Sequence, residues 1–325
     1  MDDLEFETTL DVFGGTGSVS YLMKTMDKEV TFNDFLLCNT TSARALIRNS
    51  SIKLSEKWLD AIENVDPYRG IVADTYGGVF FTEEENEEID KIAHCIFSNP
   101  DTKLEGAQRD IALHILSQSL LMKRPFNLFH RSNLNIRLKE CDRKFGNKTT
   151  WEKPIADLMR KNLNEVNSAI YSNGKRHHVY QRDALNIKEK YDLIYVDPPY
   201  CSTKGLCADY QNYYSFLDGL CDYKNWKEKI DTTKMNLPLL PKHHSFTHDT
   251  FESDLKKLFF MHSEATIVMS YKTPGQPTIE RLTEILSETH SEPTLHCKKF
   301  NYALNRNNGS CRENLLVALP KKPKK

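Results

Sequence analysis

Long apolar runs are missing from this sequence. None of its 325 residues falls in a run of about eighteen apolar residues, the length that a membrane-spanning helix needs. The start, Met1-Asp2-Asp3-Leu4-Glu5, is acidic and lacks the basic and apolar segments of a signal peptide. Hydrophobic residues make up 39% of the chain and charged residues 27%, ordinary values for a globular protein. We therefore expect a cytoplasmic protein.

Metal-ligand spacing is missing as well. None of the eight cysteines forms a C-x-x-C pair, so a zinc site is poorly supported. The pairs His177-His178 and His243-His244 have no carboxylate or cysteine at ligand spacing. The sequence predicts no metal site, and a reducing compartment favours free thiols.

An overall excess of positive charge is also absent. The net charge is -1, which lacks the basic signature of many nucleic-acid-binding proteins. Any nucleic-acid surface must therefore be a local patch. Residues 123–161 hold eleven basic residues against four acidic ones. Candidate phosphate contacts within this basic segment are Lys123, Arg124, Arg131 and Arg137, and an ordinary solvated helix surface remains an equally good explanation.

The pattern of short β-type runs and amphipathic segments predicts an α/β fold. Strands are expected at 8–13, 29–32, 178–180, 191–196, 265–270 and 313–319, with a helix at 18–24 that Ser18 caps. Residues 41–176 are mainly helical in pattern, with clear helices at 83–97 and 111–121. We expect a discontinuous sheet domain of residues 1–40 and 177–320, a helical insertion at 41–176, and a disordered basic tail at 321–325.

A glycine-rich turn follows the first expected strand. It reads Phe13-Gly14-Gly15-Thr16-Gly17 and precedes a helix, so backbone can approach a ligand closely there. The turn lacks the spacing of a dinucleotide-binding loop and the Lys-Ser/Thr pair of a P-loop. A nucleoside without a pyrophosphate fits better. Asp34, after the second strand, suits a ribose hydroxyl pair, although a plain turn aspartate is the more common role for such a residue.

The most informative segment is Asp197-Pro198-Pro199-Tyr200, directly after an apolar run that suits a central buried strand. Ligands of open α/β sheets bind beyond the carboxyl ends of the strands. The prolines fix φ and offer carbonyls without N–H groups, while the carboxylate can accept both hydrogens of an amine. A tyrosine ring can stack on a planar base. A rigid turn with a core tyrosine is the alternative.

Together, these motifs resemble those of the D12 class of N6-adenine DNA methyltransferases, which includes the Dam-type enzymes. The family's F-x-G-x-G cofactor motif matches residues 13–17, and its D-P-P-Y catalytic motif matches residues 197–200. Further cofactor positions match Asp11, Asp34 and Asp183. The long insertion between the two main motifs is similar to the Dam-type arrangement, in which it helps to recognise the target sequence.

The resemblance implies a Rossmann-like sheet that binds S-adenosylmethionine and methylates a flipped adenine in double-stranded DNA, in a restriction-modification or phage-defence setting with a cognate restriction endonuclease as a possible partner. Asp197 and the Pro198 carbonyl would accept the hydrogens of the adenine amine, and Tyr200 would stack on the base. The remaining matched residues, Asp11, Phe13, Gly14, Gly15, Thr16, Gly17, Asp34 and Asp183, would bind the cofactor.

One departure from the family pattern concerns the segment before Asp11. Family members carry a Gly-Lys or Ser-Lys pair there, and none of the ten preceding residues matches it. A truncated chain, an element supplied by another subunit, and weak cofactor binding all remain open. Three other functions also remain: RNA adenine-N6 methylation, a non-catalytic nucleic-acid-binding subunit, and a nucleoside-binding protein.

Overall fold

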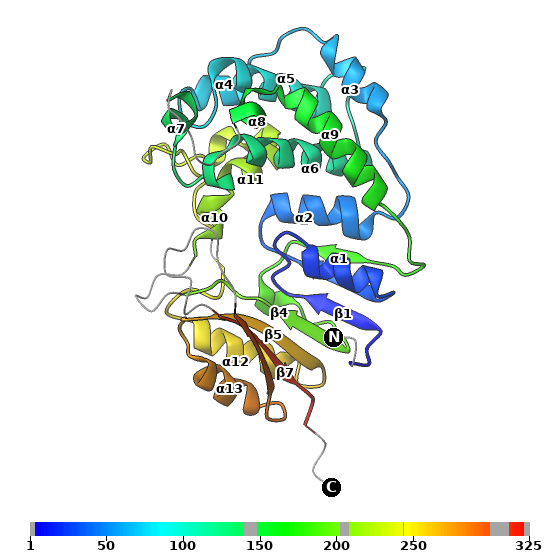
Figure 1. The fold of residues 1–325 in the computed structure, drawn as a ribbon, viewed down its shortest axis with the longest axis vertical. Coiled ribbons are helices and arrows are strands. Elements are labelled where there is room, and N and C mark those ends of the chain that lie inside the picture. Colours follow the sequence, from blue (N-terminus) through cyan, green and yellow to red (C-terminus); the bar gives the residue numbers. More distant parts are fainter. Residues whose placement is uncertain (1–3, 140–147, 202–207, 243, 300–311, 322–325) are drawn as a thin grey trace. The chain divides into compact units, whose positions relative to one another are not determined.

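The computed structural model describes residues 4–139, 148–201, 208–242, 244–299 and 312–321. The chain divides into two compact units (Figure 1). The first, the sheet unit, comprises Met1–Phe35, Asn173–Asp209 and His243–Lys325, and the second, the helical unit, comprises Leu36–Ser172 and Tyr210–Lys242. The division differs from the predicted boundaries chiefly at residues 210–242, which the sequence analysis assigns to the sheet domain.

Within the described residues, the sheet unit contains a seven-stranded sheet in the order β3-β2-β1-β4-β5-β7-β6. The strands are β1 (Thr8–Asp11), β2 (Glu29–Asn33), β3 (His178–Tyr180), β4 (Leu193–Val196), β5 (Thr266–Thr273), β6 (Thr294–Lys299) and β7 (Arg312–Ala318). The first five pair in parallel, whereas β7 runs antiparallel to both β5 and β6. The helices are α1 (Ser18–Thr25), η3 (Ala184–Asn186), α12 (Phe251–Met261) and α13 (Ile279–Ser287). The predicted Rossmann-like α/β sheet is confirmed.

Alternate residues of β1 point to opposite faces of the sheet, as the two-residue period of a strand requires. On one face, Thr9 and Asp11 contact α1, where the Thr9 hydroxyl lies 3.3 Å from the Met23 sulfur. On the other face, Leu10 and Val12 belong to the apolar core formed with α12 and α13, which lie beside β5 and β7 (Figure 1). The strand is therefore buried on both sides.

The order of the strands reverses direction between β1 and β4. The chain moves outward from β1 through β2 to β3, then returns to β4 on the other side of β1 and continues to β5. Asp11 pairs with Tyr195, so these two parallel strands end at the same edge of the sheet. Such a reversal opens a crevice at the carboxyl ends of the strands, where ligands of open α/β sheets bind.

Strand β4 confirms the prediction of a central buried strand, because all four of its residues are buried between β1 and β5. Strand β6 was not predicted. Its side chains are all exposed and mostly polar, so its sequence carries no apolar alternation. Ser18 is not the helix cap. Gly17 occupies that position with a φ of 79°, and Ser18 is the first helical residue.

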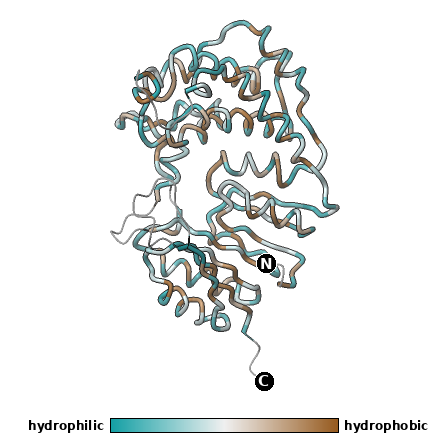
Figure 2. The backbone as a smooth tube through the Cα atoms, in the orientation of Figure 1, coloured by the Kyte–Doolittle hydropathy of each residue, from teal (hydrophilic) through white to brown (hydrophobic). Residues whose placement is uncertain are grey.

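The helical unit consists of helices alone within the described residues. They are α2 (Leu37–Ala43), η1 (Arg44–Arg48), α3 (Glu56–Glu63), α4 (Ile71–Thr75), α5 (Glu83–Phe97), α6 (Gly106–Lys123), η2 (Pro125–Asn127), α7 (Leu134–Leu138), α8 (Lys148–Glu152), α9 (Ile155–Ala169), α10 (Tyr210–Tyr213), α11 (Ser215–Cys221), η4 (Tyr223–Asn225) and η5 (Lys227–Lys229). Apolar and polar stretches alternate along the longer of these helices (Figure 2). Helix α5 begins with a capping box in which Thr82 and Glu85 satisfy each other's backbone N–H groups.

Residues 210–242 belong to the helical unit because their aromatic side chains complete its core. The Phe216 ring stacks on Phe129 at 5.0 Å and meets the Trp226 ring edge-on at 5.0 Å. Trp226 also lies 5.2 Å from the Tyr76 ring. These residues come soon after Asp197-Pro198-Pro199-Tyr200 in the sequence, and their neighbours along the chain gave no sign that their partners lie in the insertion.

Three chain-wide expectations can be compared with the structure. In the part of the chain that the structure describes, no helix has the length and apolar character needed to cross a membrane. Cys38, Cys95, Cys221 and Cys297 are free thiols as expected, but Cys201 is disulfide-bonded. Of the predicted disordered tail, residues 322–325 lie outside the described residues, and the Lys321 ammonium donates to the carbonyls of Ser287 and Glu288.

Candidate active site

The glycine turn connects β1 to α1 and is folded tightly against β2. Gly14 N donates to the Asn33 carbonyl at 2.8 Å, and Gly17 N donates to the Gly14 carbonyl at 2.8 Å. A Cβ on Gly14 would lie 2.1 Å from the Phe32 ring, so no larger residue fits this backbone. Gly15 and Gly17 have φ values of 52° and 79°, in the left-handed region that favours glycine. The three glycines are therefore required by the turn itself.

The end of β2 holds this turn in place. The Asp34 carboxylate accepts from Gly15 N at 2.9 Å. The neighbouring Asn33 amide donates to the carbonyls of Val12 at 3.0 Å and Arg182 at 3.1 Å. Asn33 thus ties together the ends of three strands, a role that its sequence context did not reveal.

Asp11, the last residue of β1, is fully buried on the α1 side of the sheet. One carboxylate oxygen accepts from the Ser20 hydroxyl at 2.7 Å. The other, Oδ1, is buried and has no hydrogen-bond partner among the described residues. Burial, together with the neighbouring carboxylates of Asp197 and Asp34, raises the pKa of Asp11 to about 7, although the hydrogen bond from Ser20 opposes the rise. A buried acceptor without a partner at the crevice is suited to a ligand donor.

The remaining residues of the predicted cofactor motif occupy different environments. Phe13 is partly buried and meets the Phe246 ring edge-on at 4.9 Å. Thr16 is exposed, and its hydroxyl lies 2.9 Å from that of Ser18. Phe246 was not identified from the sequence, because it lies far along the chain and follows no recognisable motif.

Asp183 lies after β3, where its carboxylate organises two loops. It accepts from Leu185 N at 2.9 Å and so begins the short helix η3. It also accepts from the backbone N–H of Ser245 at 2.6 Å and from the Ser245 hydroxyl. Asp183 therefore fixes the segment that carries Phe246 next to Phe13. Its direct contact with a cofactor remains a prediction.

The segment Asp197-Pro198-Pro199-Tyr200 follows β4 directly, at the same edge of the sheet as the glycine turn. The Tyr200 hydroxyl donates to Asp197 Oδ1 at 2.6 Å. Burial raises the pKa of Asp197 above its ordinary value, and the hydrogen bond from Tyr200 partly opposes that rise. Asp197 is therefore a partly desolvated carboxylate that one hydroxyl already orients.

The Tyr200 ring packs against residues of β5. It meets the Tyr271 ring edge-on at 5.7 Å, and the Lys272 ammonium lies 4.9 Å from its centroid. Lys272 pairs across the strands with Glu313. Burial raises the pKa of Glu313, Asp197 raises it further, and Lys272 opposes the rise. Neither Lys272 nor Glu313 was predicted from the sequence to lie near Tyr200. The stacking of Tyr200 on a base remains a prediction.

Three carboxylates, Asp11, Asp34 and Asp197, thus gather at the ends of three adjacent strands around the glycine turn. Their mutual repulsion contributes to the raised pKa of Asp11. Such a group favours a ligand that carries positive charge, because each carboxylate gains from a nearby cation.

Three of the four predicted DNA contacts are instead buried within the helical unit. Lys123 and Arg137 both pair with Glu85, at 2.8 Å and 2.6 Å. Arg124 donates to the carbonyls of Phe80, Ser132 and Arg131, and it is 2% exposed. These side chains are engaged within the helical unit, whereas Arg131 of the predicted set is exposed. Their contact with DNA stays a prediction.

Comparison with known proteins extends the motif match to most of the chain. The chain is 27% identical over 301 residues to the Type II methyltransferase M2.HphI of Haemophilus parahaemolyticus, an alignment that covers 90% of this chain and 84% of that protein. Residues 3–234 match the D12 class N6 adenine-specific DNA methyltransferase family, and the matched region contains both the glycine turn and Asp197-Pro198-Pro199-Tyr200. The protein therefore belongs to the D12 class of N6 adenine-specific DNA methyltransferases.

Proposed function

We propose that this protein transfers a methyl group from S-adenosylmethionine to the N6 amine of an adenine flipped out of double-stranded DNA. One observation carries the proposal. The carboxylate of Asp197 and the turn at Gly14–Gly17 follow adjacent parallel strands and lie at one edge of the sheet. A methyl donor on the turn and an amine at Asp197 would then share a single crevice.

The residues around the glycine turn fit S-adenosylmethionine. This cofactor, when bound, supplies a methyl group already activated on a positively charged sulfur. The buried Asp11 Oδ1 offers an acceptor and the acidic group offers compensating charge for a ligand with ammonium and sulfonium groups. Gly14, which has no room for a side chain, allows backbone to approach the nucleoside closely. Asp34 and Asp183 remain candidates for the ribose and the adenine of the cofactor.

Asp197 and Pro198 would act on the target amine. The adenine nitrogen is a poor nucleophile, because its lone pair is delocalised into the ring. Its two hydrogens would be accepted by the Asp197 carboxylate and the Pro198 carbonyl, which localises the lone pair toward the methyl group. The methyl group would move to the nitrogen as its bond to the sulfur of the donor breaks, and the sulfur would keep the bonding electrons. The nitrogen, then cationic, would lose a proton that the Asp197 carboxylate would accept. Positioning supplies much of the acceleration in such a displacement.

Tyr200 and Pro199 would shape the pocket for the base. An adenine in a duplex must leave the stack, at a cost of a few kcal/mol. Stacking on the Tyr200 ring would return about 1–3 kcal/mol. Pro199 restricts the backbone between the carboxylate and the ring.

The biological setting follows from the same proposal. The helical unit would recognise the target sequence, as the insertion does in the Dam-type arrangement. The similarity to a Type II methyltransferase supports a restriction-modification role with a cognate endonuclease, and action on cellular DNA would place the protein in the cytoplasm. A subunit that supplies the Gly-Lys or Ser-Lys element would be a further partner if the chain alone binds cofactor weakly.

The test is incubation of the protein with isotopically labelled S-adenosylmethionine and unmethylated duplex DNA, followed by nucleoside analysis. We expect labelled N6-methyladenine from DNA and much less from RNA of the same sequence. Label in RNA alone would favour RNA methylation. Absence of label from both, together with absent cofactor binding in calorimetry, would favour a non-catalytic nucleic-acid-binding subunit.

A further inference from the structure

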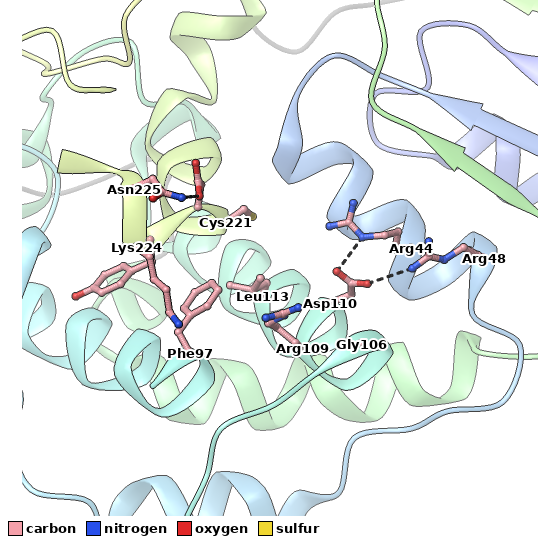
Figure 3. A pocket seen from close by; sticks show the side chains of 12 residues that line it. Arg44, Arg48, Phe97, Gly106, Arg109, Asp110, Leu113, Cys221, Lys224 and Asn225 are labelled. Atoms are coloured by element: carbon pink, nitrogen blue, oxygen red, sulfur yellow. Dashed lines mark hydrogen bonds and ion pairs between the residues drawn. The ribbon is translucent and has the colours of Figure 1, made fainter. Parts of the chain in front are cut away.

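A cluster of basic side chains lies in the helical unit, outside the basic segment 123–161. Residues of η1, α5, α6, α11 and η4 line a cavity of about 410 Å³ (Figure 3). Four basic side chains and two acidic ones line it: Arg44, Arg48, Arg109, Lys224, Asp110 and Asp222. The lining therefore carries an excess of positive charge.

The two acidic side chains are already engaged. Asp110 accepts from Arg44 Nε at 3.0 Å and lies 3.8 Å from Arg48 Nη2, as the dashed lines in Figure 3 mark. Asp222 pairs with Lys229, which does not line the cavity, and it accepts from Asn225 at 2.8 Å. Both acids are thus already paired with other residues, and Asp110 also interacts electrostatically with Arg109.

Arg109 and Lys224 are the basic residues that remain. Within the described residues, neither forms an ion pair with an acidic side chain within 4.0 Å. Lys224 is exposed and Arg109 is partly exposed, so both can reach solvent or a ligand. Arg44 has a different role, because it also donates to the hydroxyls of Thr40 and Thr41 and so fixes Asp110 beside the cavity.

The start of α6 adds to this positive field. Gly106, Arg109, Asp110 and Leu113 lie on one face of the helix and line the cavity from its first two turns. Glu105, at the N-cap, makes no side-chain capping bond. The first N–H groups of an 18-residue helix, with the positive end of its dipole, favour an anion at this place.

We propose that this site, centred on Arg109 and Lys224, binds phosphates of the DNA backbone and so positions the duplex on the helical unit. The inference rests on the proposed function for its ligand. Arginine and the helix start recognise phosphate geometry without reading a base, so the contact contributes affinity and salt dependence but no sequence preference.

The test measures binding of a fluorescent duplex by anisotropy at salt concentrations between about 50 and 200 mM. The variants are Arg109→Ala, Lys224→Ala, the double variant, and the charge-preserving pair Arg109→Lys and Lys224→Arg. Lys57→Ala is the matched control, because Lys57 is an exposed lysine on α3 of the same unit and lies outside both the cavity and the basic segment 123–161. Thermal unfolding checks that each variant is folded.

The double variant should reduce the slope of log affinity against log salt by about 1.8, since each phosphate contact contributes about 0.9. Its affinity at about 100 mM salt should fall about tenfold, while the charge-preserving pair and Lys57→Ala keep the wild-type slope. An unchanged slope in the double variant, or an equal loss in Lys57→Ala, would overturn the assignment. Binding of inorganic phosphate that the variants abolish without changing the DNA slope would point to a free anion and would overturn it too.

The outcome separates this inference from the proposed function. A wild-type protein that fails to methylate DNA, but whose salt slope falls in the double variant, would refute the methyl transfer and leave the phosphate site intact. Methylation by the wild type with an unchanged slope in the double variant would support the methyl transfer and refute the phosphate site.

Discussion

Burial of the Asp11 carboxylate lowers the stability of the folded protein, but a buried carboxylate suits a cationic ligand. Its pKa is about 7 in the folded protein against 3.8 in a free side chain, so the folded state holds its proton more tightly. The unfolded state therefore gains stability relative to the folded state as pH rises from 3.8 toward 7. Above that range the full cost of the buried charge is present.

Asp11→Asn should accordingly stabilise the cofactor-free protein more at pH 8 than at pH 5. The difference should not exceed about 3 kcal/mol, because each pKa unit corresponds to about 1.4 kcal/mol. Urea unfolding of both proteins at the two pH values measures it. The same substitution should weaken binding of S-adenosylmethionine. An equal stability change at both pH values would show that the Asp11 carboxylate is not responsible.

Tyr200 combines two functions that substitutions can separate. Tyr200→Phe keeps the ring but removes the hydrogen bond to Asp197. Because that hydrogen bond lowers the pKa of the Asp197 carboxylate, its loss should raise the pKa. The acid limb of the methylation rate should therefore move to higher pH, with the rate at alkaline pH nearly retained. Tyr200→Ala also removes the stacking surface and should cost about tenfold to hundredfold in rate. A Tyr200→Phe profile superimposable on the wild type would refute the link between the two side chains.

The residues that the sequence identified are those whose chemistry is concentrated in short segments. The glycine turn and Asp197-Pro198-Pro199-Tyr200 are contiguous motifs at strand ends, and the structure brings them to one edge of the sheet. The ion pairs of Lys123 and Arg137 could not be predicted, because the acid that pairs with both, Glu85, lies far upstream. A run of charge in one segment carries no information about a distant partner.

At the scale of elements, the turn between β1 and α1 depends on two different properties of glycine. Gly14 lies against the Phe32 ring, whereas Gly15 has room for a Cβ, whose nearest neighbour would be 3.8 Å away, but has a positive φ. Gly14→Ala must move the turn or the ring and should cost about 1–3 kcal/mol in stability. It should also weaken cofactor binding at least tenfold.

Gly15→Ala is the matched comparison, because only backbone strain opposes it. Its cost should be about 1 kcal/mol, with a smaller loss of cofactor affinity. Chemical denaturation and calorimetric titration of both variants measure the two effects. A larger loss of binding in Gly15→Ala than in Gly14→Ala would contradict the close packing of this turn against Phe32.

The elements that periodicity predicted well are those buried on a regular face. The strands of the sheet interior and helix α5 follow their expected ranges closely, because apolar spacing reports burial directly. Strand β6 escaped prediction because it lies at the edge of the sheet with every side chain exposed. Because β6 has no buried face, no apolar alternation marks its sequence.

At the scale of the whole molecule, the clustering of charged residues and the division into two units could be predicted only in part from the sequence. A net charge of -1 allows a basic site, but the four basic residues of the cavity come from segments scattered between Arg44 and Lys224. Likewise, residues 210–242 return to the helical unit through contacts of Phe216 and Trp226 with distant aromatic rings. Both features depend on contacts between separate segments.

The central claim is that Asp197 performs the transfer in a crevice that the glycine turn supplies with cofactor. The most direct measurement compares methyl transfer to DNA and cofactor binding in Asp197→Ala and in the wild type. We predict that Asp197→Ala binds S-adenosylmethionine with nearly wild-type affinity and forms no detectable N6-methyladenine, because Asp197 is proposed to contact the target amine and not the cofactor. Methylation by Asp197→Ala at a rate near that of the wild type would contradict the account.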